Sequence, residues 1–353
     1  MHIKHYLLTG CLFLLCTISA TGQVLGGKHV FSFLDLPPAA QVTALGSVNV
    51  AQQNNDLSLT ALNPALLREN MDMHLQVNYA AYFAGVKYGH GMIGYHASGL
   101  NTTFAASMQY VNYGQVTHTD AAGNILGTFT PRDFTVQVSA SRRYLEKWYY
   151  GMTMKFVHSR YQQYVSSGIG ADVGIAYQDT ARLMQIAVVA KNMGVQLRTY
   201  AYQEQEPLPF DLQVGISQRL RHVPLQLSAT IHHIYQFDVR YADPAWDNGA
   251  IINTANSAEG NNTFDKLFRH FVLAAQMEVG KYVELTASYN HLRRQELALD
   301  RQKGLSGFSA GIGVVTKKLQ LRYARSWYQQ ATAFNQLGIN IPLREWGIVP
   351  APH

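Results

Sequence analysis

Three short patterns in this chain match patterns that catalytic or metal-binding sites use. Gly89–Gly94 matches G-x-G-x-x-G of dinucleotide sites, and Gly307–Gly311 matches G-x-S-x-G of serine hydrolases. Both sites need a strand that turns sharply into a helix, whereas both segments here continue as alternating strand-like sequence. His232 and His233 are adjacent, and neighbouring strand side chains point to opposite faces, so we expect no joint chelation. We therefore predict a non-enzymatic protein with no catalytic residue, cofactor or metal.

Charged residues within the alternating segments are the remaining candidates for chemistry. Four of them are predicted to line an interior: Lys155, Asp172, Glu284 and Arg322. Because buried charges in proteins are normally paired, we favour salt links that fill the interior over proton transfer.

The elements that position these residues are predicted to be strands. In the segment 134–141, Phe, Val, Val and Ala alternate with Thr, Gln, Ser and Ser, and a period of two places each set on one face. The same alternation predicts fourteen strands, at 73–84, 85–97, 101–113, 132–143, 148–164, 167–178, 182–193, 209–221, 223–241, 268–280, 282–293, 306–316, 318–328 and 331–341.

Strand length and loop distribution indicate a membrane barrel. Most predicted strands have about 11–14 residues, compared with ~5–6 in soluble proteins and ~9–11 in a tilted membrane-spanning strand. Every long connection follows an odd-numbered strand, as in barrels with short periplasmic turns and long outer loops. We predict an all-β fold, an antiparallel transmembrane β-barrel of about 14 strands in residues 73–343, with its apolar face in contact with outer-membrane lipid. A secreted soluble β-protein with a hydrolase or lectin role is the disfavoured alternative.

Composition excludes two other classes of protein. Mean hydropathy is −0.09, and no run of about 18 apolar residues follows the N-terminal region, so a helical membrane protein is excluded. The net charge of +6 is spread over 353 residues, which is too dilute for a nucleic-acid partner.

The first residues resemble an export signal. Leu7–Ile18 is almost continuously apolar, follows a basic start and precedes small residues, which predicts a signal peptide at 1–22. Cys11 and Cys16, the two cysteines of the chain, lie within it, so the mature chain would contain no disulfide.

The segment before the first strand does not alternate. Residues 23–72 are predicted to form a plug inside the barrel or a periplasmic segment. Within them, Asn63 is expected to cap a short helix that begins at Pro64. Residues 344–353 are predicted to be a C-terminal tail.

Two N-terminal stretches, together with the strand series, resemble a known family. Gly26–Ala40 reads GGKHVFSFLDLPPAA and leads into Thr43–Gly46, and Asn63–Leu67 reads NPALL. The chain is thereby similar to the PorV/PorQ family of outer-membrane proteins of the type IX secretion system of Bacteroidetes, including its PorQ members, and more remotely to FadL-like barrels. The resemblance implies fourteen strands, an N-terminal plug and a location in the outer membrane.

The resemblance also implies partners. PorQ-like proteins belong to an attachment complex with a PorV-like barrel, a PorU-like sortase and a PorZ-like surface protein, which they are expected to hold at the membrane. Anchoring this complex is our leading expectation for function. The alternative is a FadL-like transporter of hydrophobic small molecules, which would need an apolar pocket between the N-terminal segment and the barrel wall.

Residues for partner binding are predicted from the long connections. Trp246 is a large aromatic residue among turn-forming residues, and tryptophan is enriched among interface anchors. We predict that it contacts a partner protein, with packing inside its own loop as the alternative. Arg293 and Arg294 lie beside the next long connection and are predicted to meet lipopolysaccharide phosphates, with solvated charge as the alternative.

Overall fold

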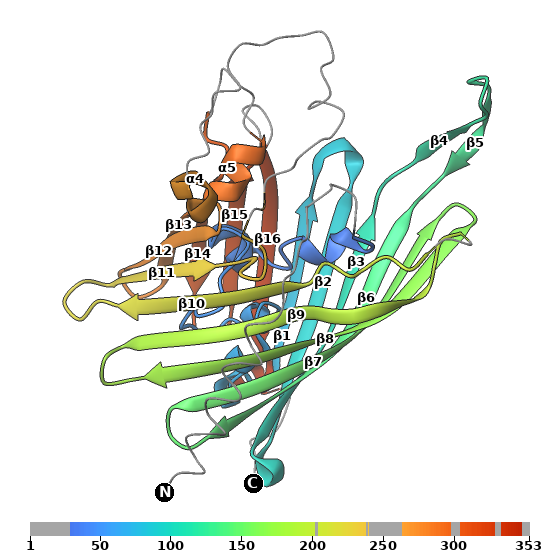
Figure 1. Ribbon diagram of the computed structural model, residues 1–353. Helices are drawn as coiled ribbons and strands as arrows, with labels where there is room; N and C mark the ends of the chain where they lie inside the picture. Colours follow the sequence, from blue (N-terminus) through green and yellow to red (C-terminus); the bar gives the residue numbers. More distant parts are fainter. Residues whose placement is uncertain are drawn as a thin grey trace, which may run out of the picture.

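The computed structural model describes residues 29–201, 204–237, 239, 263–297, 304–328 and 333–347. In these residues fourteen strands form one closed antiparallel barrel (Figure 1). They are β1 (His74–Ala81), β2 (Lys87–Ala97), β3 (Thr102–Asn112), β6 (Arg132–Tyr144), β7 (Trp148–Tyr161), β8 (Tyr164–Asp179), β9 (Met184–Arg198), β10 (Asp211–Arg219), β11 (Leu225–Ile231), β12 (Phe271–Val279), β13 (Val283–Asn290), β14 (Phe308–Val315), β15 (Gln320–Trp327) and β16 (Ala333–Pro342).

The barrel closes by pairing its first strand with its last. β1 pairs with β16 in a register that places Val77 opposite Ile339, and each other strand pairs with its neighbours in sequence, except that β3 pairs with β6. The intervening β4 (Val116–Thr119) and β5 (Ile125–Phe129) form a separate hairpin. Closure leaves no unpaired sheet edge, which is the condition for a sheet to lie in hydrocarbon.

The barrel is apolar outside and polar inside. Along β7, the outward Met152, Met154 and Phe156 are 47%, 52% and 43% exposed, whereas the inward Thr153 and Lys155 between them are 2% and 6% exposed. This arrangement reverses that of a soluble barrel. The predicted fold, an antiparallel barrel of about fourteen strands with an N-terminal plug or periplasmic segment, is confirmed. Among the described residues, no helix has the length and hydropathy needed to span a bilayer.

The long connections lie at one end of the barrel. The turn end carries connections such as 145–147 and 280–282, and the opposite loop end carries 113–131 and 199–210. The β4–β5 hairpin and the helices α4 (Thr263–Phe268) and α5 (His291–Leu297) also lie at the loop end (Figure 1). The predicted sorting of long connections to one end therefore holds for these elements.

Several predicted strands differ in length from the observed ones; the predicted strand 182–193, for example, continues five residues further, to Arg198 of β9. The predicted strand 223–241 ends at Ile231, because His233 has a left-handed backbone (φ 53°) that cannot continue a strand. The predicted strand 282–293 ends at Asn290, whose side-chain oxygen accepts a hydrogen bond from the backbone of Arg293 and so helps to start α5. The hairpin, α4 and α5 were not predicted.

Residues 29–72 lie inside the barrel, and we call them the plug. The plug contains the helix α2 (Ala40–Ala44) and four short 3₁₀ helices: η1 (Ser32–Asp35), η2 (Leu57–Ala61), η3 (Pro64–Leu66) and η4 (Glu69–Met71). As predicted, the Asn63 side chain caps η3, accepting a hydrogen bond from the Ala65 backbone. Three further 3₁₀ helices lie outside the plug: η5 (Phe83–Gly85), η6 (Ser98–Leu100) and η7 (Leu343–Trp346).

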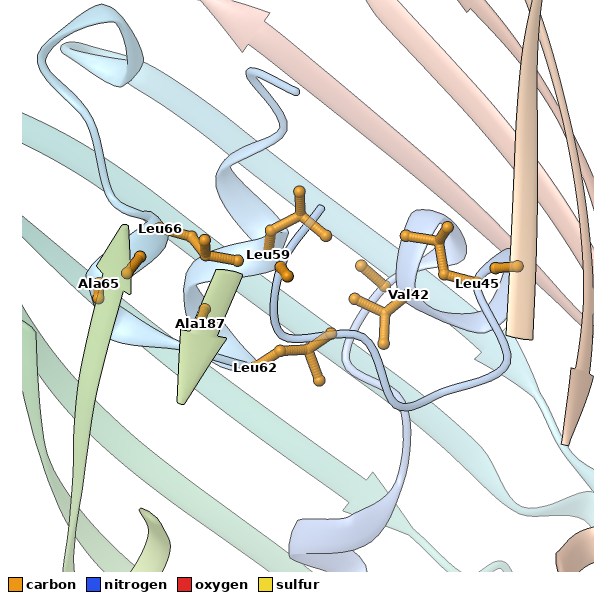
Figure 2. Close-up of a cluster of buried hydrophobic side chains, with 11 residues drawn as sticks. Val42, Leu45, Leu59, Leu62, Ala65, Leu66 and Ala187 are labelled. Carbon is orange, nitrogen blue, oxygen red and sulfur yellow. The ribbon is translucent and has the colours of Figure 1, made fainter. Parts of the chain in front are cut away.

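The plug has an apolar core of its own. Val42, Leu45, Leu59 and Leu62 point toward one another in Figure 2 and are at most 2% exposed. The barrel contributes small side chains to this cluster, such as Ala187 of β9. The plug therefore buries its own leucines at the centre and can present polar side chains to the polar inner wall.

Candidate functional site between the plug and the barrel wall

A buried charge cluster fastens the plug to the wall. An Arg322 nitrogen lies 2.6 Å from an Asp56 oxygen of the plug, and another lies 3.1 Å from a Glu284 oxygen of β13. Gln76 donates a hydrogen bond to the second Asp56 oxygen (2.8 Å). The predicted salt links of Glu284 and Arg322 are thus present. Sequence reasoning missed Asp56, because alternation does not reveal which plug residue meets which strand.

A second buried pair supports an irregularity in the wall. Lys155 and Asp172 are 2.7 Å apart, and Lys155 also donates to the Asn192 side chain. Asn192 has a left-handed backbone, and its N–H donates to Asp172 at 2.8 Å. The β8–β9 register shifts between Ala171 and Val173, so these three side chains stabilise a β-bulge in the barrel wall. The predicted pairing of interior charges holds here as well.

Polar side chains of the plug bond to the wall on several strands. Gln41 and Gln52 both donate to the Gln276 side chain of β12, at 2.9 and 2.7 Å, and Asn49 donates to Ser228 of β11 at 2.8 Å. Because these groups are buried, each bond also removes the cost of an unpaired polar atom. The plug is thus held by several strands of the barrel wall.

A largely apolar pocket of about 340 Å³ lies between the plug and the wall at the loop end, and we call it the outer pocket. It is lined by His29, Val30, Phe31 and Ser32 of the plug, by Asp133, Tyr161 and Tyr164 of the wall, and by Tyr200 and Glu206 of the β9–β10 connection.

Hydrogen bonds fix the aromatic walls of the outer pocket. The Tyr200 hydroxyl contacts the Ser159 hydroxyl at 2.5 Å, and the Tyr161 and Tyr200 rings meet edge to face with centroids 5.6 Å apart. Burial raises the pKa of Tyr200, so its hydroxyl stays protonated at neutral pH and can donate. Apolar walls with a few fixed polar groups are typical of small-molecule sites. The sequence did not indicate that these tyrosines converge with Phe31.

The turn end has a pocket of different character. About 420 Å³ is lined mainly by polar side chains, among them Arg68, Arg143 and Arg219, and the Arg68 guanidinium stacks 3.5 Å above the Tyr149 ring. At mid-depth, a cavity lined by Asp35 and other residues has only about 20 Å³, enough for about one water molecule. This cavity does not hold a molecule larger than water.

A histidine cluster lies at the loop end, where β10 begins and β11 ends. The expectation that the side chains of His232 and His233 point to opposite faces was wrong. The left-handed backbone at His233 brings the two rings to the same side, with their Nδ1 atoms 2.5 Å apart. Burial lowers the pKa of both histidines, so both rings are neutral at neutral pH. Asp211 lies beside them, and the backbone N–H of His233 donates to its carboxylate.

The predicted partner residues fall in different places. Trp246 lies outside the described residues. The Arg293 guanidinium lies 4.5 Å from the centre of the Tyr328 ring and donates to Ser326, and Arg294 donates to the backbone oxygen of Ser306. Both arginines therefore have contacts within the barrel rim, and their binding to lipopolysaccharide stays a prediction.

Comparison with known proteins identifies no family for the chain. No protein-family model matches it, and no curated protein matches it. Among solved structures, it is similar to a mutant of the monoaromatic hydrocarbon channel TodX (12% identity, 86% of this chain and 96% of that chain, TM-score 0.48). A Pseudomonas aeruginosa FadL homologue (11% identity, 86% and 98%, TM-score 0.46) and the porin KdgM (4%, 76% and 98%, TM-score 0.34) are also similar. The barrel thus resembles those of outer-membrane channels and porins.

Proposed function

We propose that this chain is a non-enzymatic outer-membrane barrel that admits small hydrophobic molecules past its plug. The observation that carries the proposal is the outer pocket, because the transporter alternative requires an apolar pocket between the N-terminal segment and the wall. Its volume of about 340 Å³ suits a molecule with one or two aromatic rings. The outward apolar side chains support placement in a lipid bilayer.

Phe31 is the plug residue that would couple ligand binding in the outer pocket to movement of the plug. Its ring lies against β8 so closely that a Cβ added at Gly168 would be 2.7 Å from Phe31 Cε2. The Phe31 backbone is left-handed (φ 59°), a conformation that non-glycine residues adopt at some cost. A ligand that packs against this ring in the outer pocket would thus act directly on the start of the plug.

We expect Phe31→Ala to weaken binding of naphthalene by about tenfold, because loss of the ring removes at least ~1.4 kcal/mol of apolar contact. Fluorescence titration of naphthalene against the detergent-solubilised chain measures this change. Phe264→Ala is the matched control, because Phe264 lies on α4 and is 77% exposed. Equal affinity in wild type and Phe31→Ala, or no naphthalene binding to wild type, would contradict the transport proposal.

The attachment role is a second candidate, favoured by the β4–β5 hairpin. The hairpin leaves the barrel at the loop end (Figure 1), and its residues Ile125 and Leu126 are 73% and 60% exposed. Exposed apolar residues that project beyond the wall suit docking of a protein, such as the PorZ-like surface partner. In this role the chain would anchor the partner, together with a PorU-like sortase and a PorV-like barrel, and Trp246 would be a further contact.

We expect the double substitution Ile125→Asp and Leu126→Asp to reduce recovery of a PorZ-like partner by about tenfold or more, since a docked apolar pair contributes at least ~1.4 kcal/mol. The measurement is affinity purification of the chain from detergent-solubilised envelopes, followed by quantification of the partner. Thr117→Asp places a charge on an exposed residue of the same hairpin and is the control. Undiminished recovery from the double variant would exclude the hairpin as the docking surface.

A further inference from the structure

Three metal-binding side chains converge at the loop end from two neighbouring strands. Asp211 is the first residue of β10, and His232 and His233 directly follow β11. β10 and β11 are antiparallel partners, and beyond the last strand pair the N–H of Ile234 still bonds to the carbonyl of Leu212. The barrel itself therefore places Asp211 beside the histidine pair.

The ligand atoms are nearly at the spacing that a metal ion requires. Nδ1 of His232 and Nδ1 of His233 are 2.5 Å apart, Nδ1 of His233 and a carboxylate oxygen of Asp211 are 3.9 Å apart, and one atom from each residue fits within 4.8 Å. Ligands bound at ~2.0–2.1 Å to a tetrahedral ion lie about 3.3 Å apart. The 2.5 Å distance between the two Nδ1 atoms and the 3.9 Å distance from His233 to Asp211 would each need to change by less than ~1 Å. Small rotations of the rings allow such a change.

The surroundings orient these ligands as the neighbours of metal ligands do. The backbone of His233 donates to one oxygen of Asp211 and Gln213 donates to the other, both at 2.6 Å. Such outer hydrogen bonds fix a ligating carboxylate. His232 is 3% exposed, so its ring is shielded from solvent. A cation between the two rings would satisfy the Nδ1 lone pairs of both.

We propose that Asp211, His232 and His233 bind one divalent transition-metal ion, with zinc as the best fit. Two imidazole nitrogens and one carboxylate oxygen are ligands that zinc accepts, and hard cations such as calcium prefer oxygen alone. Three protein ligands leave the fourth position for water or a group of a partner. The ion would link the start of β10 to the end of β11 and so stabilise the rim where the adjoining long connections begin.

The test uses the intact, untagged chain in detergent with Co²⁺, which replaces zinc and absorbs visible light in tetrahedral nitrogen and oxygen sites. We expect wild type to bind one Co²⁺ per chain with visible absorption bands that added Zn²⁺ removes. Asp211→Asn keeps an acceptor for the His233 N–H, and His233→Asn suits the left-handed backbone, so both variants should fold. Each should bind Co²⁺ at least about tenfold more weakly, as expected for a lost ligand.

His222→Asn is the matched control, because His222 is an exposed histidine on the turn between β10 and β11 at the opposite end of the barrel. It should bind Co²⁺ as wild type does. Absence of Co²⁺ bands in wild type, or equal loss of binding in His222→Asn, would overturn the assignment. Retained heat-modifiable migration on gels confirms that each variant is still a barrel, so loss of binding then reports on the ligands.

Discussion

Replacing Arg322 with methionine is expected to destabilise the folded barrel by about 3–5 kcal/mol. The substitution keeps most of the side-chain volume but leaves Asp56 and Glu284 buried without their cation. Leaving two carboxylates without a cation in a region of low dielectric costs far more than losing a solvent-exposed ion pair. Urea unfolding in detergent micelles, followed by tryptophan fluorescence and by heat-modifiable gel migration, measures the change.

Arg325→Met is the matched control on the same strand. Arg325 is exposed on the outer face of β15, and its guanidinium lies 5.7 Å from the centre of the Trp327 ring. Its loss should change stability by less than about 1 kcal/mol. Adding Asp56→Asn to Arg322→Met should recover part of the lost stability, because one of the two unpaired carboxylates is then removed. Equal stability of Arg322→Met and Arg325→Met would show that the charge cluster does not hold the plug.

The alternation of side chains made the barrel predictable from sequence. A strand in a membrane barrel has lipid on one face and the lumen on the other along its whole length, so a period of two persists without interruption. The predicted strands 101–113 and 132–143 therefore agree with β3 and β6 to within one residue at each end. Interior charges were predictable for the same reason, since Lys155, Asp172, Glu284 and Arg322 occupy inward positions of that period.

The features that the sequence did not reveal depend on contacts between residues distant in the chain, or on the backbone conformation of a single residue. The end of β11 is set by the left-handed backbone of His233, and histidine carries no signal that a glycine would give at such a position. The outer pocket brings together Phe31 and Tyr200, whose proximity depends on how the plug is threaded through the lumen. Plug residues have no period that relates them to a particular strand.

Some glycines of the barrel wall lie where the plug passes closely. A substitution at one of them tests whether the plug seals the lumen. A Cβ added at Gly151 of β7 would lie 2.4 Å from the carbonyl carbon of Pro64 and 2.6 Å from the nitrogen of Ala65. These are backbone atoms of η3, so they cannot be avoided by rotating a side chain. Gly151→Leu should therefore push η3 away from the wall.

We expect Gly151→Leu to open the barrel to small solutes. Overpacking costs about 1–3 kcal/mol, which would raise the population of molecules with a displaced plug by about 5- to 150-fold. Swelling of liposomes in arabinose measures the opening, because wild type with its plug in place should admit little sugar. Gly89→Leu is the control, since a Cβ at Gly89 meets nothing within 4 Å. If liposomes carrying folded Gly151→Leu swell no faster than those carrying Gly89→Leu, the plug does not control passage, and the transport proposal loses its gate.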